Sequence, residues 1–151
     1  MKVDVQVETL IERSVDVVAA YAGDPSNAPE WYVNIKSIAW RTPPPLAEGS
    51  QLDFVAQFLG RRIAYTYEIV ELVPGARLVM ETAQGPFPMR TTYAWQPFGT
   101  ATRMTLRNEG SPSGFSSMAA PLMERAMRRA TTKDLARLKG LLETGPAPAT
   151  T

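Results

Sequence analysis

Three tyrosines carry the clearest chemical potential in the sequence, and each stands in a segment of alternating apolar and polar residues. Tyr65 and Tyr67 lie in RIAYTYEIV, and Tyr93 lies in TTYAW. Side chains alternate between the two faces of a strand, so all three are predicted to point inward. A buried phenol can donate a hydrogen bond or act as a weak general acid. The more ordinary alternative is a core tyrosine whose hydroxyl bonds to the protein.

An aspartate near the C-terminus is the other unusual group. On a helical wheel, Asp134 falls between Met127 and Leu138, inside an apolar face. A carboxylate there must be paired, protonated or in contact with water. Asp134 could therefore be an acid/base group or a polar anchor, and with Tyr65 and Tyr93 it completes the candidate catalytic set. The alternative is an ion pair or cap contact with the sheet, because structural pairs also bury carboxylates.

The residue types that are missing restrict the chemistry further. The chain has no histidine and no cysteine, which excludes a Ser-His-Asp triad, a zinc hydrolase and a thiol nucleophile. It also has no glycine-rich phosphate loop. Arg90, Arg103 and Arg107 follow the outward parity of their strands, so none is predicted to polarise a buried carbonyl. We expect no metal and no cofactor.

The composition limits which binding partners and which cellular compartment are expected. The chain has 151 residues, a net charge of +1 and 44% hydrophobic residues, as expected for one domain with a real core. A near-neutral charge argues against nucleic acid as a partner. No apolar run approaches the ~20 residues that span a bilayer. We expect a cytoplasmic protein, either a monomer or a homodimer, whose partner is a hydrophobic small molecule.

Periodicity defines the elements that must position these groups. The N-terminus alternates as a strand to about residue 12, and Ser14 and Gly23 bound a short helix. A turn or second short helix follows and delivers Trp31 and Tyr32. Six further strands are predicted, over residues 35–42, 50–59, 61–73, 77–83, 88–97 and 101–109.

A helical period begins near residue 115, with a kink or separate first turn expected at Pro121. Its predicted buried face comprises Met123, Met127, Ala130, Thr131, Leu138 and Leu141. The predicted fold class is α+β: a curved seven-stranded antiparallel sheet gripping a long C-terminal helix, with two short helices after the first strand. We assign residues 1–144 to this ligand-binding domain and 145–151 to a flexible tail.

One helix about 10 Å across cannot fill the concave face of seven twisted strands. An empty apolar void of roughly 300 Å³ would cost about 7 kcal/mol, which rivals the stability of a whole domain. Any real cavity must therefore be open to solvent or occupied. Inward aromatic and methionine side chains are its candidate walls, although residues at these periods also build solid cores. The candidate ligand-binding residues are Trp31, Tyr32, Phe54, Phe58, Tyr65, Tyr67, Met80, Met89, Tyr93, Trp95, Met104, Leu106, Met123 and Met127.

The order of several motifs resembles a known family. These motifs are I-E-x-S-x-x-x-V from Ile11, D-P-x-x-x-P-x-W from Asp24, Y-x-I-V-E-x-x-P-G-x-R-L from Tyr67, W-x-P-x-x-x-x-T-R-M-T from Trp95, and D-L-x-R-L-K-x-x-L-E from Asp134. Together, over residues 3–143, they resemble the START-like helix-grip (SRPBCC) superfamily, in its polyketide cyclase/dehydrase and lipid-transport branch. The resemblance implies a deep hydrophobic cavity, with Trp31 and the loop before Gly49 near its mouth.

Three functions are compatible with these residues and with the resemblance. The first is a carrier or sensor of a lipid, polyketide or quinone-like molecule. The second is a polyketide cyclase/dehydratase that uses tyrosine and aspartate as acid-base groups. The third, implied by co-chaperone relatives, is a protein-interaction module, which the near-neutral composition does not support.

Overall fold

The computed structural model describes residues 2–113 and 119–144, so the expected tail at 145–151 lies outside the described residues. The chain begins with one strand and three short helical segments, continues through six strands, and ends in one long helix. In order these are β1 (Val3–Ile11), α1 (Val15–Ala22), η1 (Pro25–Asn27), α2 (Ala28–Trp31), β2 (Ile35–Trp40), β3 (Gln51–Phe58), β4 (Arg61–Val73), β5 (Arg77–Gln84), β6 (Met89–Phe98), β7 (Ala101–Gly110) and α3 (Ala120–Thr144).

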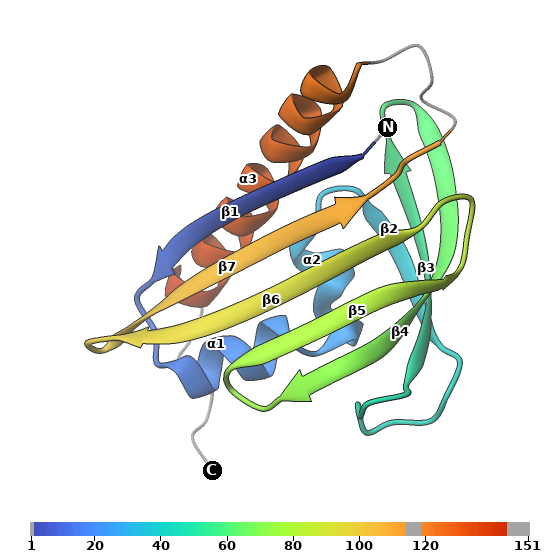
Figure 1. Cartoon of the computed structure of the whole chain (residues 1–151). Helices are drawn as coiled ribbons and strands as arrows, with labels where there is room; N and C mark the ends of the chain where they lie inside the picture. Colours follow the sequence, from blue (N-terminus) through green and yellow to red (C-terminus); the bar gives the residue numbers. More distant parts are fainter. Residues whose placement is uncertain (1, 114–118, 145–151) are drawn as a thin grey trace.

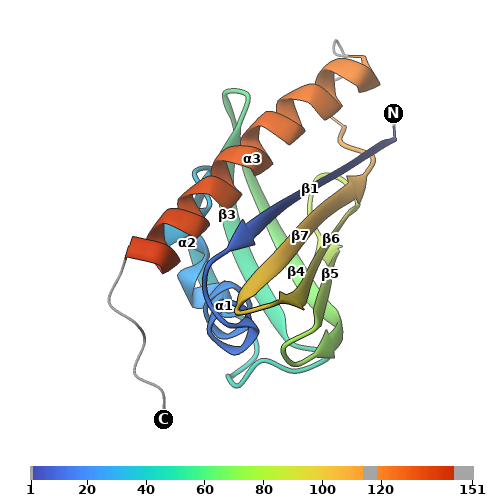
Figure 2. The ribbon, with the colours of Figure 1, turned by 90° about the vertical axis from the view of Figure 1, so that its left-hand side faces the viewer.

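The strands form one antiparallel sheet in the order β1-β7-β6-β5-β4-β3-β2 (Figure 1). Consecutive strands from β2 to β7 are neighbours, and β1 closes the order by pairing with β7. The turned view shows α3 running beside β1, with α2 next to its C-terminal half (Figure 2). The predicted fold class, a curved sheet that grips a long C-terminal helix, is confirmed.

The curvature of the sheet has local causes in β4. Its register against β5 shifts between Thr66 and Tyr67, and again between Ile69 and Glu71. Such bulges bend a strand and increase its twist. At the other end of β4, Leu59 and Gly60 both have positive φ, as the tight β3–β4 hairpin turn requires.

The long helix corrects two details of the sequence prediction. Leu141 is 41% exposed, and Leu142 is buried in its place. From Leu138, a step of four residues returns about to the same face, whereas a step of three falls roughly 60° short. Pro121 is the second residue of α3 and does not divide it, because a backbone N–H in the first turn has no partner within the helix.

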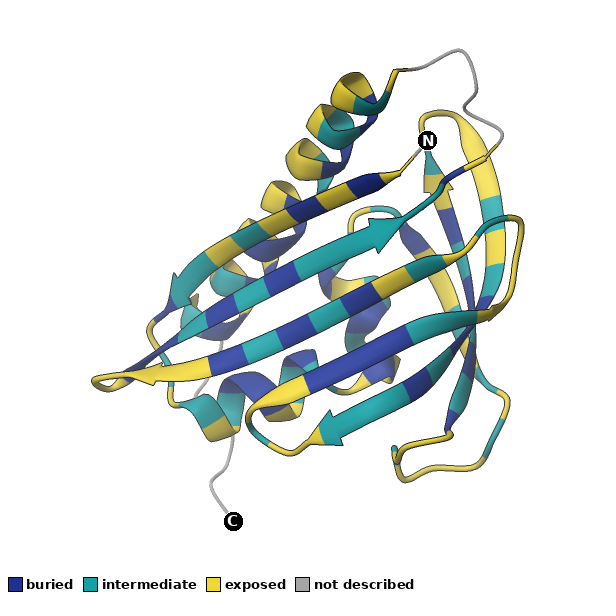
Figure 3. Cartoon of the chain, viewed as in Figure 1, coloured by how far each residue is buried: buried dark blue, intermediate teal, exposed yellow. Residues whose placement is uncertain are grey.

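Burial alternates along the strands on either side of β7, as expected for a sheet with one covered face (Figure 3). The main core cluster gathers at the end of the sheet that α1 and α2 cover. It includes Trp31, Trp95, Met104 and Leu106, which pack with Leu135 and Leu138 of α3. A second cluster, built on Val3, Val5, Met123 and Met127, joins the start of α3 to β1. The space described below lies between the sheet and α3.

Candidate ligand-binding cavity

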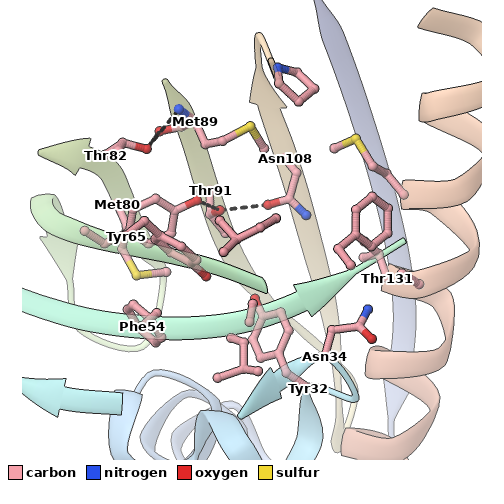
Figure 4. A pocket seen from close by; sticks show the side chains of 18 of the residues that line it. Tyr32, Asn34, Phe54, Tyr65, Met80, Thr82, Met89, Thr91, Asn108 and Thr131 are labelled. Carbon is pink, nitrogen blue, oxygen red and sulfur yellow. Dashed lines mark hydrogen bonds between the residues drawn. The ribbon is translucent and has the colours of Figure 1, made fainter. Parts of the chain in front are cut away.

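A cavity of about 170 Å³ lies between the concave face of the sheet and α3 (Figure 4). An engineered cavity of about 150 Å³ accepts benzene, so this one can hold a ring or a short chain. The walls come from β2–β7, α3 and the loops around Tyr32 and Phe87. They are mainly apolar, with several hydroxyl and amide groups among them.

An aromatic cluster on β3 and β4 forms one wall. Phe54 and Tyr65 are cross-strand partners whose rings stack with centroids 5.5 Å apart. Tyr67 meets Tyr65 edge-on at 4.9 Å. Among the described residues no hydrogen bond reaches the Tyr65 hydroxyl, and burial raises the pKa of this phenol well above 10. The Tyr65 hydroxyl is therefore a neutral donor without a partner in the described part of the chain.

A chain of hydrogen bonds crosses the cavity wall from β4 to β7. The hydroxyls of Tyr67 and Thr91 are 2.7 Å apart, and Thr91 donates to Oδ1 of Asn108, also at 2.7 Å (Figure 4). Since Thr91 has one hydrogen and gives it to an oxygen that only accepts, Tyr67 must donate to Thr91. This leaves the Nδ2 hydrogens of Asn108 without a partner among the described residues. The network therefore presents a donor in the cavity wall.

A second polar pair joins the loop after α2 to β6. The hydroxyls of Tyr32 and Tyr93 lie 2.5 Å apart, so the phenol of Tyr93 has a protein partner. Burial raises the pKa of both phenols, and nearby Asp134 raises both further. Both side chains are therefore protonated near neutral pH and can donate a hydrogen bond but cannot act as bases.

The carboxylate of Asp134 makes one structural hydrogen bond and also lines the cavity. Its Oδ1 accepts the backbone N–H of Val33 at 2.9 Å, which ties α3 to the chain after α2. Asp134 also lines the cavity and is only 4% exposed. Burial raises its pKa to about 6, against the opposing effects of the Val33 hydrogen bond and of Arg137. Among the described lining residues, Asp134 is the group that changes charge near neutral pH.

The structure brings most of the predicted site residues to this cavity. Tyr65, Tyr93 and Asp134, the candidate catalytic set, all line it. The candidate ligand-binding residues that line it are Tyr32, Phe54, Phe58, Tyr65, Tyr67, Met80, Met89, Tyr93, Met123 and Met127.

Four candidates lie in the core instead of the cavity wall. Trp31, Met104 and Leu106 are completely buried, and Trp95 packs against Gly23, where an added Cβ would lie 3.3 Å from its ring. They point inward as alternation predicted, but α1, α2 and the second half of α3 already fill the space at that end of the sheet. The indole N–H groups of both tryptophans have no partner among the described residues.

Some wall residues were not among the candidates. Thr91 alternates with Tyr93 along β6, and Asn108 alternates with Leu106 along β7, so both share the inner face; alternation alone does not reveal that they bond to one another. Asn34, Pro86, Phe87 and Pro112 lie outside the strands, where no period marks them. Among the described residues the walls include no lysine or arginine, and no group of three or more acidic side chains could hold a metal ion. None of the described helices has the length and apolarity needed to cross a bilayer.

The sheet, the long helix and the enclosed space define a helix-grip protein. The family model for "Polyketide cyclase / dehydrase and lipid transport" matches residues 2–143, and the chain belongs to this family. The superfamily suggested by the sequence motifs is thereby confirmed. A comparison with curated proteins finds no match.

Solved structures share the fold at low identity. A START superfamily protein from Mycobacterium smegmatis has a TM-score of 0.80 at 14% identity, with 93% of this chain and 97% of that chain covered. The protein TTHA0849 from Thermus thermophilus has 0.77 at 18%, with 90% and 94% covered. The Zhui aromatase/cyclase from Streptomyces sp. R1128 has 0.77 at 12%, with 99% and 100% covered. These likenesses concern the fold.

Proposed function

We propose that the protein binds a hydrophobic or amphipathic small molecule between the sheet and α3, as a carrier or sensor. The observation that carries this proposal is the mainly apolar cavity with donors that no described protein group uses, the Tyr65 hydroxyl and the Asn108 amide. Donors of this kind orient a ligand inside an apolar site. They also favour a ligand with a carbonyl or hydroxyl oxygen near its buried end.

A cavity-filling variant tests this proposal. Ala56 lines the cavity from β3, whereas Ala39 on β2 is exposed. Ala56→Met should weaken binding of the neutral fluorophore N-phenyl-1-naphthylamine by about tenfold or more, equivalent to about 1.4 kcal/mol, because the added side chain occupies the ligand's space. Ala39→Met is the matched control and should bind like the wild type. Circular dichroism verifies folding, since overpacking can cost about 1–3 kcal/mol.

Unchanged fluorophore affinity in a folded Ala56→Met variant would place the ligand elsewhere. Native mass spectrometry of the purified wild type adds an independent result. A co-purified small molecule of defined mass would identify the ligand class directly, and its absence from the Ala56→Met protein would locate it in the cavity.

A second candidate function is cyclisation of a poly-β-ketone chain, favoured by one observation. Asp134 is a buried carboxylate whose pKa of about 6 suits a general base near neutral pH. In such a reaction its carboxylate would take a proton from a methylene between two carbonyls. A Tyr hydroxyl would hydrogen-bond to the ketone oxygen that the new carbon–carbon bond converts to an alcohol.

The test is turnover of a synthetic poly-β-ketone thioester. Asp134→Asn should abolish cyclisation while fluorophore affinity changes by less than about threefold, below 1 kcal/mol, because the amide preserves shape. Cyclisation that survives this change would remove Asp134 from the reaction. No turnover by the wild-type protein, together with tight fluorophore binding, would leave the carrier or sensor function.

A further inference from the structure

A second hollow adjoins the cavity beside the first half of α3. Its volume is about 430 Å³, and it lies between the first half of α3 and the β3–β4 hairpin. We call it the basic groove, and its lining residues are Val33, Asn34, Phe58, Leu59, Leu122, Arg125, Ala126, Arg129, Ala130 and Lys133. Asn34, Phe58 and Ala130 also line the cavity, so these three residues form the boundary between the two spaces. In Figure 4, Asn34 lies between the strands and α3.

Three uncompensated cations form the helix side of the basic groove. Arg125, Arg129 and Lys133 stand four residues apart, so they follow one stripe of α3, and all three are exposed. Among the described residues none of them has an acidic partner. The residues outside that part, 1, 114–118 and 145–151, include no aspartate or glutamate. Like charges at this spacing repel, so the stripe costs stability instead of providing it.

Other cations of α3 contrast with this stripe. Arg128 donates to the carbonyl of Gln6, and Lys139 donates to the carbonyl of Leu10 and pairs with Glu143. Those side chains hold α3 against β1. Among the described residues the stripe in the groove makes no comparable contact, and it is available to an anion.

The basic groove also has apolar lining residues. Val33, Leu59 and Leu122 are among the few large hydrophobic side chains that the structure leaves exposed, and Leu122 is 58% exposed. A hollow lined by both apolar and cationic side chains is complementary to a molecule that has both an apolar part and a negative charge.

The size and charge of the inner cavity determine how such a molecule would lie. At about 170 Å³ the cavity encloses only a ring or short chain, so a larger ligand, the three-ring fluorophore included, must extend past the boundary residues. The cavity also contains the Asp134 carboxylate, which repels a second buried anion. A negative group is therefore excluded from the inner space and attracted to the outer one.

We propose that the ligand is an amphipathic anion whose apolar end occupies the cavity. Its carboxylate, phosphate or sulfate group lies in the basic groove against Arg125, Arg129 and Lys133. This inference rests on the proposed function and names the chemical class of the molecule bound. Its geometry requires the chain of the ligand to pass Asn34, Phe58 and Ala130.

Decanoate and 1-decanol test the inference, because they share a chain and differ in charge. Their affinities are measured below their aggregation limits by displacement of N-phenyl-1-naphthylamine. The wild type should bind decanoate at least about tenfold more tightly than 1-decanol, with a preference that falls as salt increases. The triple variant Arg125→Gln, Arg129→Gln and Lys133→Gln should lose this preference and keep its affinity for 1-decanol.

A matched control removes three exposed or half-exposed positive charges away from the groove. The substitutions Lys2→Gln, Arg90→Gln and Arg103→Gln give the same net charge and should leave the decanoate preference intact. Equal wild-type affinities for decanoate and 1-decanol would overturn the inference while supporting the proposed function. Binding of neither molecule nor the fluorophore would overturn both.

Vesicles distinguish the carried anion from an anionic membrane. Sedimentation with phosphatidylglycerol vesicles is compared for the wild type and the triple variant at Arg125, Arg129 and Lys133. If the variant loses vesicle binding but keeps the decanoate preference, the stripe contacts a membrane surface and the inference is wrong. If the triple variant loses the decanoate preference, the stripe binds the anionic group of the bound molecule.

Discussion

At the scale of single residues, Asp134 determines how the cavity responds to pH. Its carboxylate accepts one backbone hydrogen bond from Val33, and it lies near the protonated phenols of Tyr32 and Tyr93. One neutral donor does not replace the hydration that the ionised carboxylate has in water, so burial favours the protonated form. Asp134 thus anchors α3, but its ionisation lowers the free energy of unfolding, and this loss depends on pH.

The burial of Asp134 predicts how the free energy of unfolding changes with pH. The pKa of Asp134 is about 6 in the folded protein and about 3.8 when unfolded. Between pH 4 and 6 the folded protein holds a proton that the unfolded chain has released. The free energy of unfolding therefore falls as pH rises through this window, by about 3 kcal/mol at most. Asp134→Asn, whose Oδ1 can still accept from Val33, should remove this contribution.

Urea unfolding at pH 4, 5, 6, 7 and 8 measures the effect. The Asp134→Asn protein should match the wild type near pH 4 and be more stable by roughly 2–3 kcal/mol at pH 7. Asp16→Asn, at an exposed position of α1, is the control and should follow the wild-type curve. Parallel curves for Asp134→Asn and wild type would show that the carboxylate is well solvated or paired when folded.

At the scale of elements, strand alternation was the most informative sequence signal. It placed Phe54, Tyr65, Tyr67 and Tyr93 on the inner face, because a period of two admits only two faces. Helical periodicity was less exact, since an error of one residue turns a side chain by about 100° and can move Leu141 from the core to solvent. Periodicity identifies the face on which a residue lies, but it does not show what covers that face.

Loop residues and polar networks cannot be predicted from strand or helix periodicity. Asn34 and Phe87 reach the cavity from segments without a period, so tertiary structure alone places them there. The bond between Thr91 and Asn108 depends on the register of β6 against β7, which alternation does not specify. The contact of Asp134 with Val33 joins residues 101 positions apart. The helical pattern correctly marked this carboxylate as unusual, but its partner required the fold.

At the scale of the whole molecule, the space between the sheet and α3 is filled at one end, the closed end, and open at the other. Helices α1 and α2 with the second half of α3 fill one end around Trp31 and Met104. The cavity occupies the other part, where α3 meets the sheet through Met123 and Met127 and leaves space beside Phe54. Stability is therefore concentrated in packing at one end, and the contacts proposed for the ligand lie at the other.

This division predicts different outcomes for the same substitution at two inward methionines. Met104 is completely buried in the closed end, so Met104→Ala creates a new void and should cost about 2–5 kcal/mol. Met89 lines the existing cavity and is only half-buried, so Met89→Ala enlarges that space and should cost less, about 1 kcal/mol, or roughly half the value of fully burying such a side chain. Urea unfolding gives both free energies, and fluorophore titration should show changed affinity only for Met89→Ala. Equal costs with unchanged affinity at both positions would mean that the cavity is closed core in solution.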